Sequence, residues 1–360
     1  MRTEVVVIGG GQAGLAMGYH LARRGIDHVI LDGSPRIGDA WRNRWDSLAL
    51  FTPAAYSALP GMAFPGDPDR YPGKDEVADY LEGYAARFRL PVRLGERVIA
   101  LRPGPGGWMA ETADARYEAA RVVVATGPFQ RPFVPALGRE LPREVARLHS
   151  ASYRNPNQLP PGDVLVVGAG NSGVQIAEEL SRSRRVHLAV GERMPRLPRR
   201  VLGRSLFWWL EKTGAMNVTA DSRLGRRMSR TETLIGTGPD GLRRSRGVRL
   251  TGRVTGVDGD AVTTEDGQRI RPAAVVWATG FRPDFGWIDA PVLDARGRPV
   301  HQRGVTSAPG LYFLGLSWLH TRGSALLGWV GRDAEHLAGA IAATGSAREA
   351  ISPAPAKANG

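Results

Sequence analysis

Short apolar runs alternate with a helical pattern from the start of the chain. Four consecutive branched apolar residues end abruptly at a glycine, which predicts a buried strand over residues 4–8. Residues 12–24 carry apolar side chains at helical spacing, and residues 29–31 form a second short apolar run that ends at Asp32. A strand, a tight turn, a helix and a second strand within about thirty residues have the length of a parallel crossover unit. The pattern therefore predicts parallel α/β structure here.

The same plan recurs in the middle of the chain. An apolar run at residues 164–167 ends at a glycine, a helical pattern covers residues 173–180, and another apolar run covers residues 186–190. Two similar units in one chain favour two nucleotide-binding domains.

Each unit is followed, well downstream, by an apolar strand that ends in the tripeptide Ala-Thr-Gly. These strands are predicted at residues 122–124 and 275–277. We place the crossings between the domains near these tripeptides, so that the second domain is inserted into the first. The expected fold class is α/β, with two Rossmann-like dinucleotide-binding domains. The expected boundaries are residues 1–130 with 281–345 for the outer domain, 131–280 for the inserted domain, and 346–360 for a disordered tail with little apolar surface.

Composition narrows the possible chemistry. The chain has 360 residues, no cysteine, and no apolar stretch of the ~20 residues that a membrane span needs. Without cysteine there is no disulfide, thiolate metal site or catalytic thiol, so redox chemistry must come from a bound cofactor. The net charge of +13 comes from arginines spread along the whole chain. We therefore expect anionic small molecules as partners rather than nucleic acid, no membrane association and, with no leader pattern at the start, a cytoplasmic location.

The first glycine-rich turn matches a dinucleotide fingerprint. Residues 9–14 have the spacing Gly-x-Gly-x-x-Gly between the first strand and helix, and Asp32 lies 18 residues beyond the last glycine. Glycine allows the tight turn, the approach of backbone to a pyrophosphate and the packing of helix on strand. The candidate cofactor-binding residues are Gly9, Gly11, Gln12, Ala13, Gly14 and Asp32.

The second turn repeats the fingerprint. Its candidate cofactor-binding residues are Gly168, Gly170, Asn171, Ser172 and Gly173. The strand that follows leads into Glu192 and Arg193, with further arginines at positions 196, 199 and 200. Arg193 is suited to a ribose 2′-phosphate, whereas Glu192 would accept hydrogen bonds from the free hydroxyls of NADH. We expect NADPH, with Arg193 as the contact, and leave NADH open.

Together, the two fingerprints, the two Ala-Thr-Gly segments and the stretch of residues 38–48 resemble flavin-containing monooxygenases. The sequence is most similar to the compact bacterial CzcO-like forms and, more distantly, to plant indole-3-pyruvate monooxygenases. The resemblance covers about residues 3–340. It implies FAD at the first fingerprint and NADPH at the second. It also implies cofactor contacts at Gly38, Trp41, Asp46, Leu48, Thr126, Gly127, Thr279, Gly280 and Gly315, with the two threonines marking the hinges.

The chain departs from the family pattern near the expected reaction centre. Of the family signature ahead of the second fingerprint, His149 and Tyr153 remain, and both a hydrogen-bonded linker role and a catalytic role are open for His149. By the resemblance, Thr52 stands where classical members place an asparagine near the flavin. His320 and Arg322 precede a glycine-containing helix that points at the flavin in such folds. These two residues contact flavin or substrate, or serve as plain capping or surface groups.

A long segment of residues 199–236 contains a strongly apolar helix over residues 206–210. It covers the active site, packs on its own domain or forms a dimer interface.

The resemblance implies an NADPH-dependent monooxygenase. Such an enzyme forms a C4a-hydroperoxyflavin from dioxygen and transfers one oxygen atom to a nitrogen, sulfur or activated carbon of a small substrate. Two alternatives stay open: a flavin oxidase or reductase without oxygen insertion, and a noncatalytic nucleotide-sensing protein. No metal site is expected, and a homodimer is possible.

Overall fold

The first lobe is built on a seven-stranded sheet. The computed structural model describes residues 1–349, with side chains described through residue 344. The strand order is β3-β2-β1-β6-β5-β4, with β21 also paired to β6. Its strands are β1 (Arg2–Ile8), β2 (His28–Leu31), β3 (Val92–Arg93), β4 (Ala100–Gly104), β5 (Gly107–Glu111), β6 (Arg116–Val124) and β21 (Leu311–Phe313). Strands β3, β2, β1, β6 and β21 are parallel, and β4 and β5 extend the sheet in antiparallel fashion.

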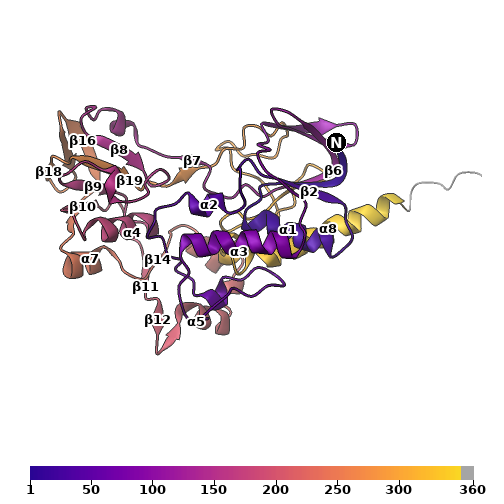
Figure 1. Cartoon of the computed structure of the whole chain (residues 1–360), viewed down its shortest axis with the longest axis horizontal. Coiled ribbons are helices and arrows are strands. Elements are labelled where there is room, and N and C mark those ends of the chain that lie inside the picture. The colour runs from indigo at the N-terminus through magenta and orange to yellow at the C-terminus, as the bar shows by residue number, and fades with distance from the viewer. Residues whose placement is uncertain (350–360) are drawn as a thin grey trace, which may run out of the picture.

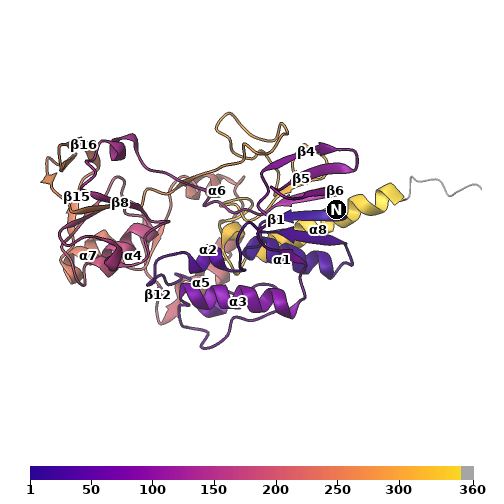
Figure 2. The same cartoon turned by 45° about the horizontal axis from the view of Figure 1, so that its top comes forward.

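Alternation along β1 explains how this sheet is buried on both faces. Val5 and Val7 face a core that includes side chains of helices α1 (Gln12–Ala22), α3 (Lys74–Arg87) and α8 (Val330–Glu349). Val6 and Ile8 face a second core with Trp108, Phe285 and Phe313. Figure 2 shows α1, α3 and α8 together on one side of the strands. The short helix α2 (Asp39–Arg42) lies between β2 and α3 in the chain.

The second lobe is built on a five-stranded parallel sheet in the order β15-β10-β9-β19-β8. Its strands are β8 (Ala146–His149), β9 (Val164–Val167), β10 (Val186–Ala189), β15 (Arg249–Thr251) and β19 (Ala274–Trp277). Helices α4 (Asn171–Leu180) and α7 (Pro239–Arg246) pack on one face. A small antiparallel sheet of β16 (Val254–Asp258), β17 (Ala261–Thr264) and β18 (Arg269–Ile270) covers the other.

Two short strands connect the lobes. Strands β7 (Arg131–Pro132) and β20 (Phe281–Arg282) pair antiparallel where the chain leaves the first sheet and returns to it. Figure 1 shows β7 between the two lobes. The Thr279 hydroxyl donates to the Phe133 carbonyl, and Thr126 accepts a hydrogen bond from the Gln130 amide at 2.7 Å. Both threonines therefore brace the crossings.

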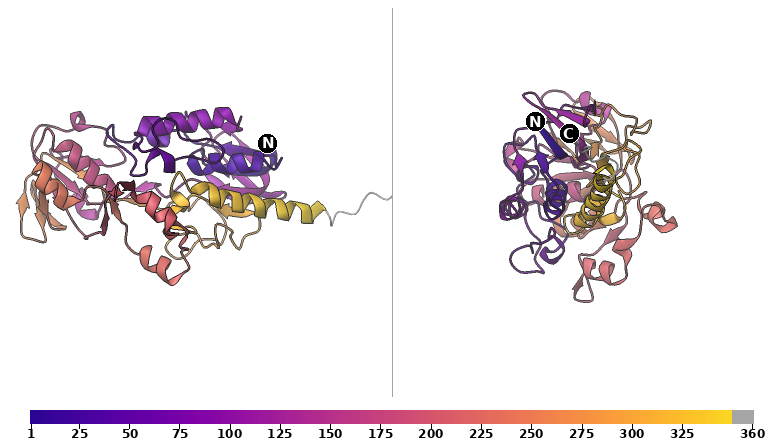
Figure 3. Two further views of the ribbon diagram at one scale, coloured as in Figure 1. Left: turned by 90° about the horizontal axis from the view of Figure 1, so that it is seen from below. Right: turned by 90° about the vertical axis from the view of Figure 1, so that its right-hand side faces the viewer.

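The segment after β10 leaves the second lobe and reaches the first. It contains β11 (Arg196–Leu197), β12 (Arg200–Val201), β13 (Arg204–Ser205), α5 (Leu206–Lys212), α6 (Arg223–Met228) and β14 (Leu234–Ile235). Seen from below, part of this salmon-coloured segment lies at the start of the yellow helix α8 of the first lobe (Figure 3), where Glu211 of α5 pairs with Arg332 of α8 at 3.2 Å. The backbone bridge between Thr219 and Thr321 joins the two parts.

The α/β fold class with two Rossmann-like units is confirmed. The expected strand at residues 164–167 matches β9, and the expected second helix begins two residues earlier, at Asn171. Helix α8 continues to Glu349, into the first residues of the stretch that the sequence analysis assigned to a tail. The rest of the predicted tail lies outside the described residues. Among the described helices, none is long and apolar enough to cross a membrane.

Candidate functional site

The turn between β1 and α1 is packed tightly at two glycines and left open at a third. Gly9 has a φ of +111°, and an added Cβ would lie 2.6 Å from the Ala125 carbonyl oxygen. A Cβ on Gly14 would lie 1.8 Å from the Gly9 carbonyl oxygen. At Gly11 no atom lies within 4 Å of the Cβ position. The turn therefore presents bare backbone to open space at Gly11.

The turn between β9 and α4 repeats this geometry. Gly168 has a φ of +104°, and its added Cβ would lie 2.4 Å from the Ala278 carbonyl oxygen. A Cβ on Gly173 would lie 1.9 Å from Gly168, and the position at Gly170 is open. In both lobes the first glycine touches the alanine of an Ala-Thr-Gly segment. This contact gives the repeated tripeptide a structural reason.

The start of α1 is suited to an anion. No side chain caps this helix, so the backbone N–H groups of its first turn are not held by a capping side chain. Asp32, at the end of β2, accepts hydrogen bonds from the backbone N–H of Gly10 at 2.6 Å and of Ser34 at 2.7 Å. These bonds hold its carboxylate beside the glycine turn.

Gln12 connects three parts of the first lobe around this turn. Its side-chain carbonyl accepts a hydrogen bond from the Trp41 indole at 3.2 Å, and its amide donates to the Ala325 carbonyl at 2.9 Å. Gly315 packs against the first turn of α1, and Gly38 packs against α3. The structure thus brings together predicted residues from positions 12, 38, 41 and 315.

Two other predicted residues lie at the contact between the lobes. The Asp46 carboxylate accepts a hydrogen bond from the Asn155 amide at 2.8 Å. Leu48 and the buried Trp45 pack against the apolar core of the second lobe, and Gln175 on α4 hydrogen-bonds the backbone of the same segment. These contacts attach the segment directly to the helix of the second fingerprint.

Thr52 is buried and already hydrogen-bonded. It is 5% exposed, and its hydroxyl lies 2.9 Å from the Ser57 hydroxyl. Ser57 donates to the Pro53 carbonyl at 3.0 Å, so the Thr52 hydroxyl donates to Ser57. Thr52 therefore offers a nearby group acceptor capacity but no free proton.

The segment holding His320 and Arg322 is rigid and contacts the long segment from the second lobe. The fully buried Ser324 hydroxyl accepts hydrogen bonds from the backbone N–H of His320 and of Thr321, both at 3.0 Å. The His320 carbonyl accepts a hydrogen bond from the backbone of Ala220 at 2.7 Å. Arg322 donates from Nη1 to the Thr233 hydroxyl at 3.4 Å.

His149 lies at the crossing between the lobes. Its Nε2–H donates to the Gly280 carbonyl at 3.0 Å, and its Nδ1 accepts from the Ala151 backbone at 3.1 Å. Burial lowers the pKa of His149, which favours this neutral form. The buried Tyr153 donates to Glu179 at 2.7 Å. Both residues hold the backbone at the entrance to the second lobe.

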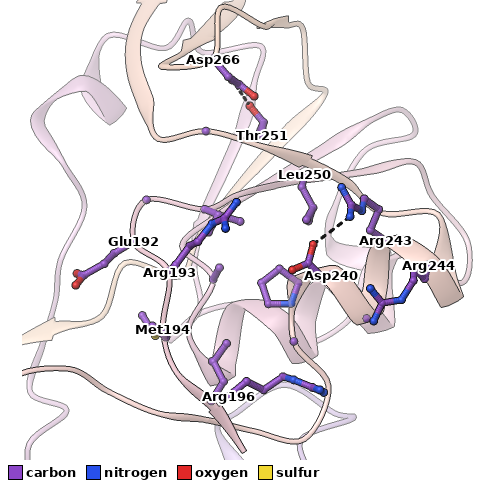
Figure 4. A pocket seen from close by; sticks show the side chains of 18 residues that line it. Glu192, Arg193, Met194, Arg196, Asp240, Arg243, Arg244, Leu250, Thr251 and Asp266 are labelled. Atoms are coloured by element: carbon purple, nitrogen blue, oxygen red, sulfur yellow. Dashed lines mark hydrogen bonds and ion pairs between the residues drawn. The ribbon is translucent and has the colours of Figure 1, made fainter. Parts of the chain in front are cut away.

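The second lobe has a cavity of about 670 Å³ beside β10 and α7. Figure 4 shows Arg193 pointing into this cavity and Glu192 pointing away from it. Arg196 and Arg244 also line the cavity, and within the described residues none of these three arginines has a carboxylate oxygen within 4.0 Å. Arg243, by contrast, pairs with Asp240 at 3.3 Å. The cavity therefore holds three unpaired cations.

Sequence reasoning missed Arg244, because Arg244 follows the fingerprint by about seventy residues and the pattern of α7 is that of a solvated helix. Among the side chains that the structure describes, residues 1–344, no group of three or more acidic or histidine residues is placed to hold a metal ion.

The apolar helix of the long segment contacts the first lobe. Phe207 on α5 is 1% exposed and packs against Phe51, Tyr56 and Trp329 of the first lobe. The Trp329 indole donates to the Glu211 carboxylate. The helix therefore packs on the first lobe as well as on residues of its own segment, and ties the two lobes together.

Comparisons with known proteins agree with this geometry. A family model described as pyridine nucleotide-disulphide oxidoreductase matches residues 6–197. The CzcO-like oxidoreductase of Geobacillus kaustophilus is 50% identical, over 93% of this chain and 97% of that protein. A probable indole-3-pyruvate monooxygenase of Arabidopsis thaliana is 29% identical, over 93% of this chain and 89% of that protein. The structure of a flavin-containing monooxygenase from Stenotrophomonas maltophilia superposes with a TM-score of 0.79 and 29% identity, covering 95% of this chain and 99% of the other.

The relatives and the fold agree with the resemblance drawn from the sequence motifs. The matching family model is named for disulfide chemistry, yet this chain has no cysteine with which to perform it. The chain belongs to the pyridine nucleotide-disulphide oxidoreductase family and, within it, is a flavin-dependent oxidoreductase of the flavin monooxygenase group that includes the CzcO-like proteins.

Proposed function

We propose that this protein is an NADPH-dependent, FAD-containing monooxygenase that inserts one oxygen atom into a small nucleophilic substrate. The observation that carries the proposal is the pair of matching glycine cradles at Gly9–Gly14 and Gly168–Gly173, in a chain without cysteine. Two dinucleotide sites provide for electron transfer from one cofactor to the other, and no protein disulfide can receive the electrons. Dioxygen is then the proposed acceptor of these electrons.

The first cradle fits FAD. The open position at Gly11 and the uncapped start of α1 leave room and N–H donors for a diphosphate, and Asp32 lies where a ribose hydroxyl would donate to it. Bound FAD would supply the electron transfer and the activation of dioxygen. The chain's own residues bind and orient: Gln12 holds Trp41 and the segment at Ala325 in fixed positions around the cradle.

The second cradle and its cavity fit NADPH. Arg193, Arg196 and Arg244 bring three cations that have no described carboxylate oxygen within 4.0 Å, although Asp240 and Asp266 also line the cavity. A ribose 2′-phosphate would accept charge-assisted hydrogen bonds from such a group. Glu192, the residue that favoured NADH, points out of the cavity (Figure 4). The assignment of these residues to FAD and NADPH is part of the proposal.

The apolar cluster of Phe51, Tyr56, Phe207 and Trp329 would exclude water from one side of the space between the lobes. Exclusion of water favours oxygen transfer over loss of peroxide. The name of the indole-3-pyruvate monooxygenase relative suggests keto acids as first substrates to screen, and the proposed oxygen transfer to nitrogen or sulfur adds amines and thioethers.

One observation favours a second candidate, a flavin oxidase or reductase. The Thr52 hydroxyl donates to Ser57, so this position has no free donor for a neighbouring oxygen intermediate. Without that donor, electrons would pass to dioxygen as peroxide.

The fate of the two oxygen atoms of dioxygen distinguishes a monooxygenase from an oxidase. In a monooxygenase, one substrate, one NADPH, one proton and one dioxygen yield NADP⁺, water and one product carrying a single oxygen atom from dioxygen. The test incubates purified, FAD-loaded protein with NADPH, ¹⁸O₂ and each candidate substrate, and measures product mass, NADPH consumption and hydrogen peroxide. We expect ¹⁸O in one product and peroxide well below NADPH consumption. One peroxide per NADPH with every substrate would establish the oxidase, and no NADPH consumption at all would leave only the nucleotide-sensing protein.

A further inference from the structure

Arg322 is a cation of the first lobe that lies against the second. It begins the 3₁₀ turn Arg322–Ala325, whose backbone is held by the fully buried Ser324 hydroxyl. Its guanidinium is partly buried, and its printed hydrogen bond is the 3.4 Å contact from Nη1 to the Thr233 hydroxyl. A rigid backbone thus directs a cation across the boundary between the lobes.

The guanidinium has no acidic partner. Burial lowers the pKa of Arg322, and the charge of Glu232 only partly opposes this shift. Within residues 1–344 no carboxylate oxygen lies within 4.0 Å of the Arg322 nitrogens. By comparison, Arg332, ten residues later, pairs with Glu211 at 3.2 Å. A half-buried guanidinium without a counter-ion is a favourable place for an anionic ligand.

Thr233 connects Arg322 to the second fingerprint. The amide of Asn171, the first residue of α4, donates to the Thr233 carbonyl at 3.4 Å and accepts from the Ile235 backbone at 3.2 Å. One residue therefore touches both the guanidinium and the helix whose start forms the second cradle. Two hydrogen bonds, from Arg322 to Thr233 and from Asn171 to Thr233, thus link the cation to the residue that follows the open backbone at Gly170.

We infer that Arg322 binds the diphosphate of NADPH across the gap between the lobes, as a coenzyme-retaining residue supplied by the FAD lobe. This inference rests on the proposed NADPH site and adds a contact that the second lobe cannot supply. The adenosine half of the coenzyme is then held by the second lobe alone, through Arg193 and its neighbours. The diphosphate is held from both sides, so release of the oxidised coenzyme requires breaking the bond to Arg322.

The test compares two ligands on the oxidised, FAD-loaded enzyme. NADP⁺ carries both the 2′-phosphate and the diphosphate, whereas adenosine 2′-phosphate carries only the former. Isothermal titration calorimetry of Arg322→Gln should show NADP⁺ binding about tenfold weaker or more, because a charge-assisted bond is lost, with adenosine 2′-phosphate unchanged. Arg193→Ala should weaken both ligands. Arg322→Lys keeps the positive charge but loses the paired N–H donors of the guanidinium, so its affinity for NADP⁺ should lie between those of wild type and Arg322→Gln.

Arg332→Gln is the matched control, because it removes an arginine of the same segment that pairs with Glu211 away from the cradle. It should leave both affinities unchanged. If Arg322→Gln binds NADP⁺ as tightly as wild type, the inference is wrong, and a raised KM for an acidic substrate would assign the guanidinium to substrate instead. If Arg322→Gln weakened the binding of NADP⁺ and of adenosine 2′-phosphate equally, the inference would also be wrong. The titration measures binding without turnover. If the enzyme makes only peroxide, the proposed oxygen transfer is refuted, and the titration still tests whether Arg322 binds the diphosphate.

Discussion

Adding a side chain at Gly11 should leave the stability of the fold nearly unchanged, whereas adding one at Gly14 should reduce it. Gly11 has a φ of −78° and a ψ of −169°, an extended conformation that any residue adopts, and its Cβ position is open. Gly11→Leu gains about 0.4–1 kcal/mol from reduced freedom of the unfolded chain, and leucine is a poorer N-cap than glycine by a comparable amount. We therefore expect the apoprotein's free energy of unfolding to change by less than about 1 kcal/mol.

Gly14→Ala should destabilise the fold itself. Its Cβ would lie 1.8 Å from the Gly9 carbonyl oxygen, and real contacts of this kind are no shorter than 3.0 Å. The turn and α1 would have to separate by about 1.2 Å, and overpacking against backbone costs about 3 kcal/mol. The two variants thus separate loss of the cofactor from loss of the fold.

Urea unfolding of apoprotein, with and without added FAD, measures both effects. At free FAD one hundred times its Kd, wild type should gain about 2.7 kcal/mol in the free energy of unfolding. Gly11→Leu should unfold like wild-type apoprotein and gain nothing, because its side chain occupies the space of the diphosphate. A folded Gly11→Leu that retains yellow colour and the full FAD shift would refute the assignment of the first cradle.

Three further predictions concern the second lobe and the contact between lobes. Arg193→Ala should raise the KM for NADPH about tenfold and leave that for NADH nearly unchanged; equal losses would assign Arg193 to structure. Phe207→Ala should lower the free energy of unfolding by about 3 kcal/mol. The control Trp208→Ala, at a partly exposed position, should lower it by about 1 kcal/mol or less. Equal losses in the two variants would contradict the role of Phe207 in joining the lobes. Burial lowers the pKa of His149 below that of the unfolded chain, so its stabilising contribution is present above about pH 6.5 and is lost as pH falls through the lowered pKa. His149→Gln should flatten the dependence of unfolding free energy on pH between 5 and 7, and an unchanged slope would show that other groups cause it.

Local pattern was sufficient for the elements that form the two cradles. Branched apolar runs that end at glycine predicted β1 and β9, since period and composition are properties of adjacent residues. The glycine spacing predicted both turns, because only glycine tolerates the contacts at positions 14 and 173. The low apolar content beyond residue 345 did not indicate where helix α8 ends, and the structure places that end at Glu349.

Contacts between distant segments depended on tertiary structure. Residues 46 and 48 were expected beside the flavin, and their observed contacts are with Asn155 and the core of the second lobe. The repeated Ala-Thr-Gly was visible as a pattern, yet its reason, the contact of each alanine carbonyl with the first glycine of a fingerprint, appears only in the folded chain.

The sequence by itself determined the two Rossmann-like units, their order along the chain and the chemistry that an absence of cysteine leaves possible. Only the tertiary structure decided that α5 packs onto the first lobe, that Arg244 joins Arg193 in one cavity, and that Arg322 meets Thr233. The physical reason is that periodicity and turn chemistry act over a few neighbouring residues. Pairings across tens to hundreds of residues depend on how apolar faces and unpaired charges meet once the lobes have packed.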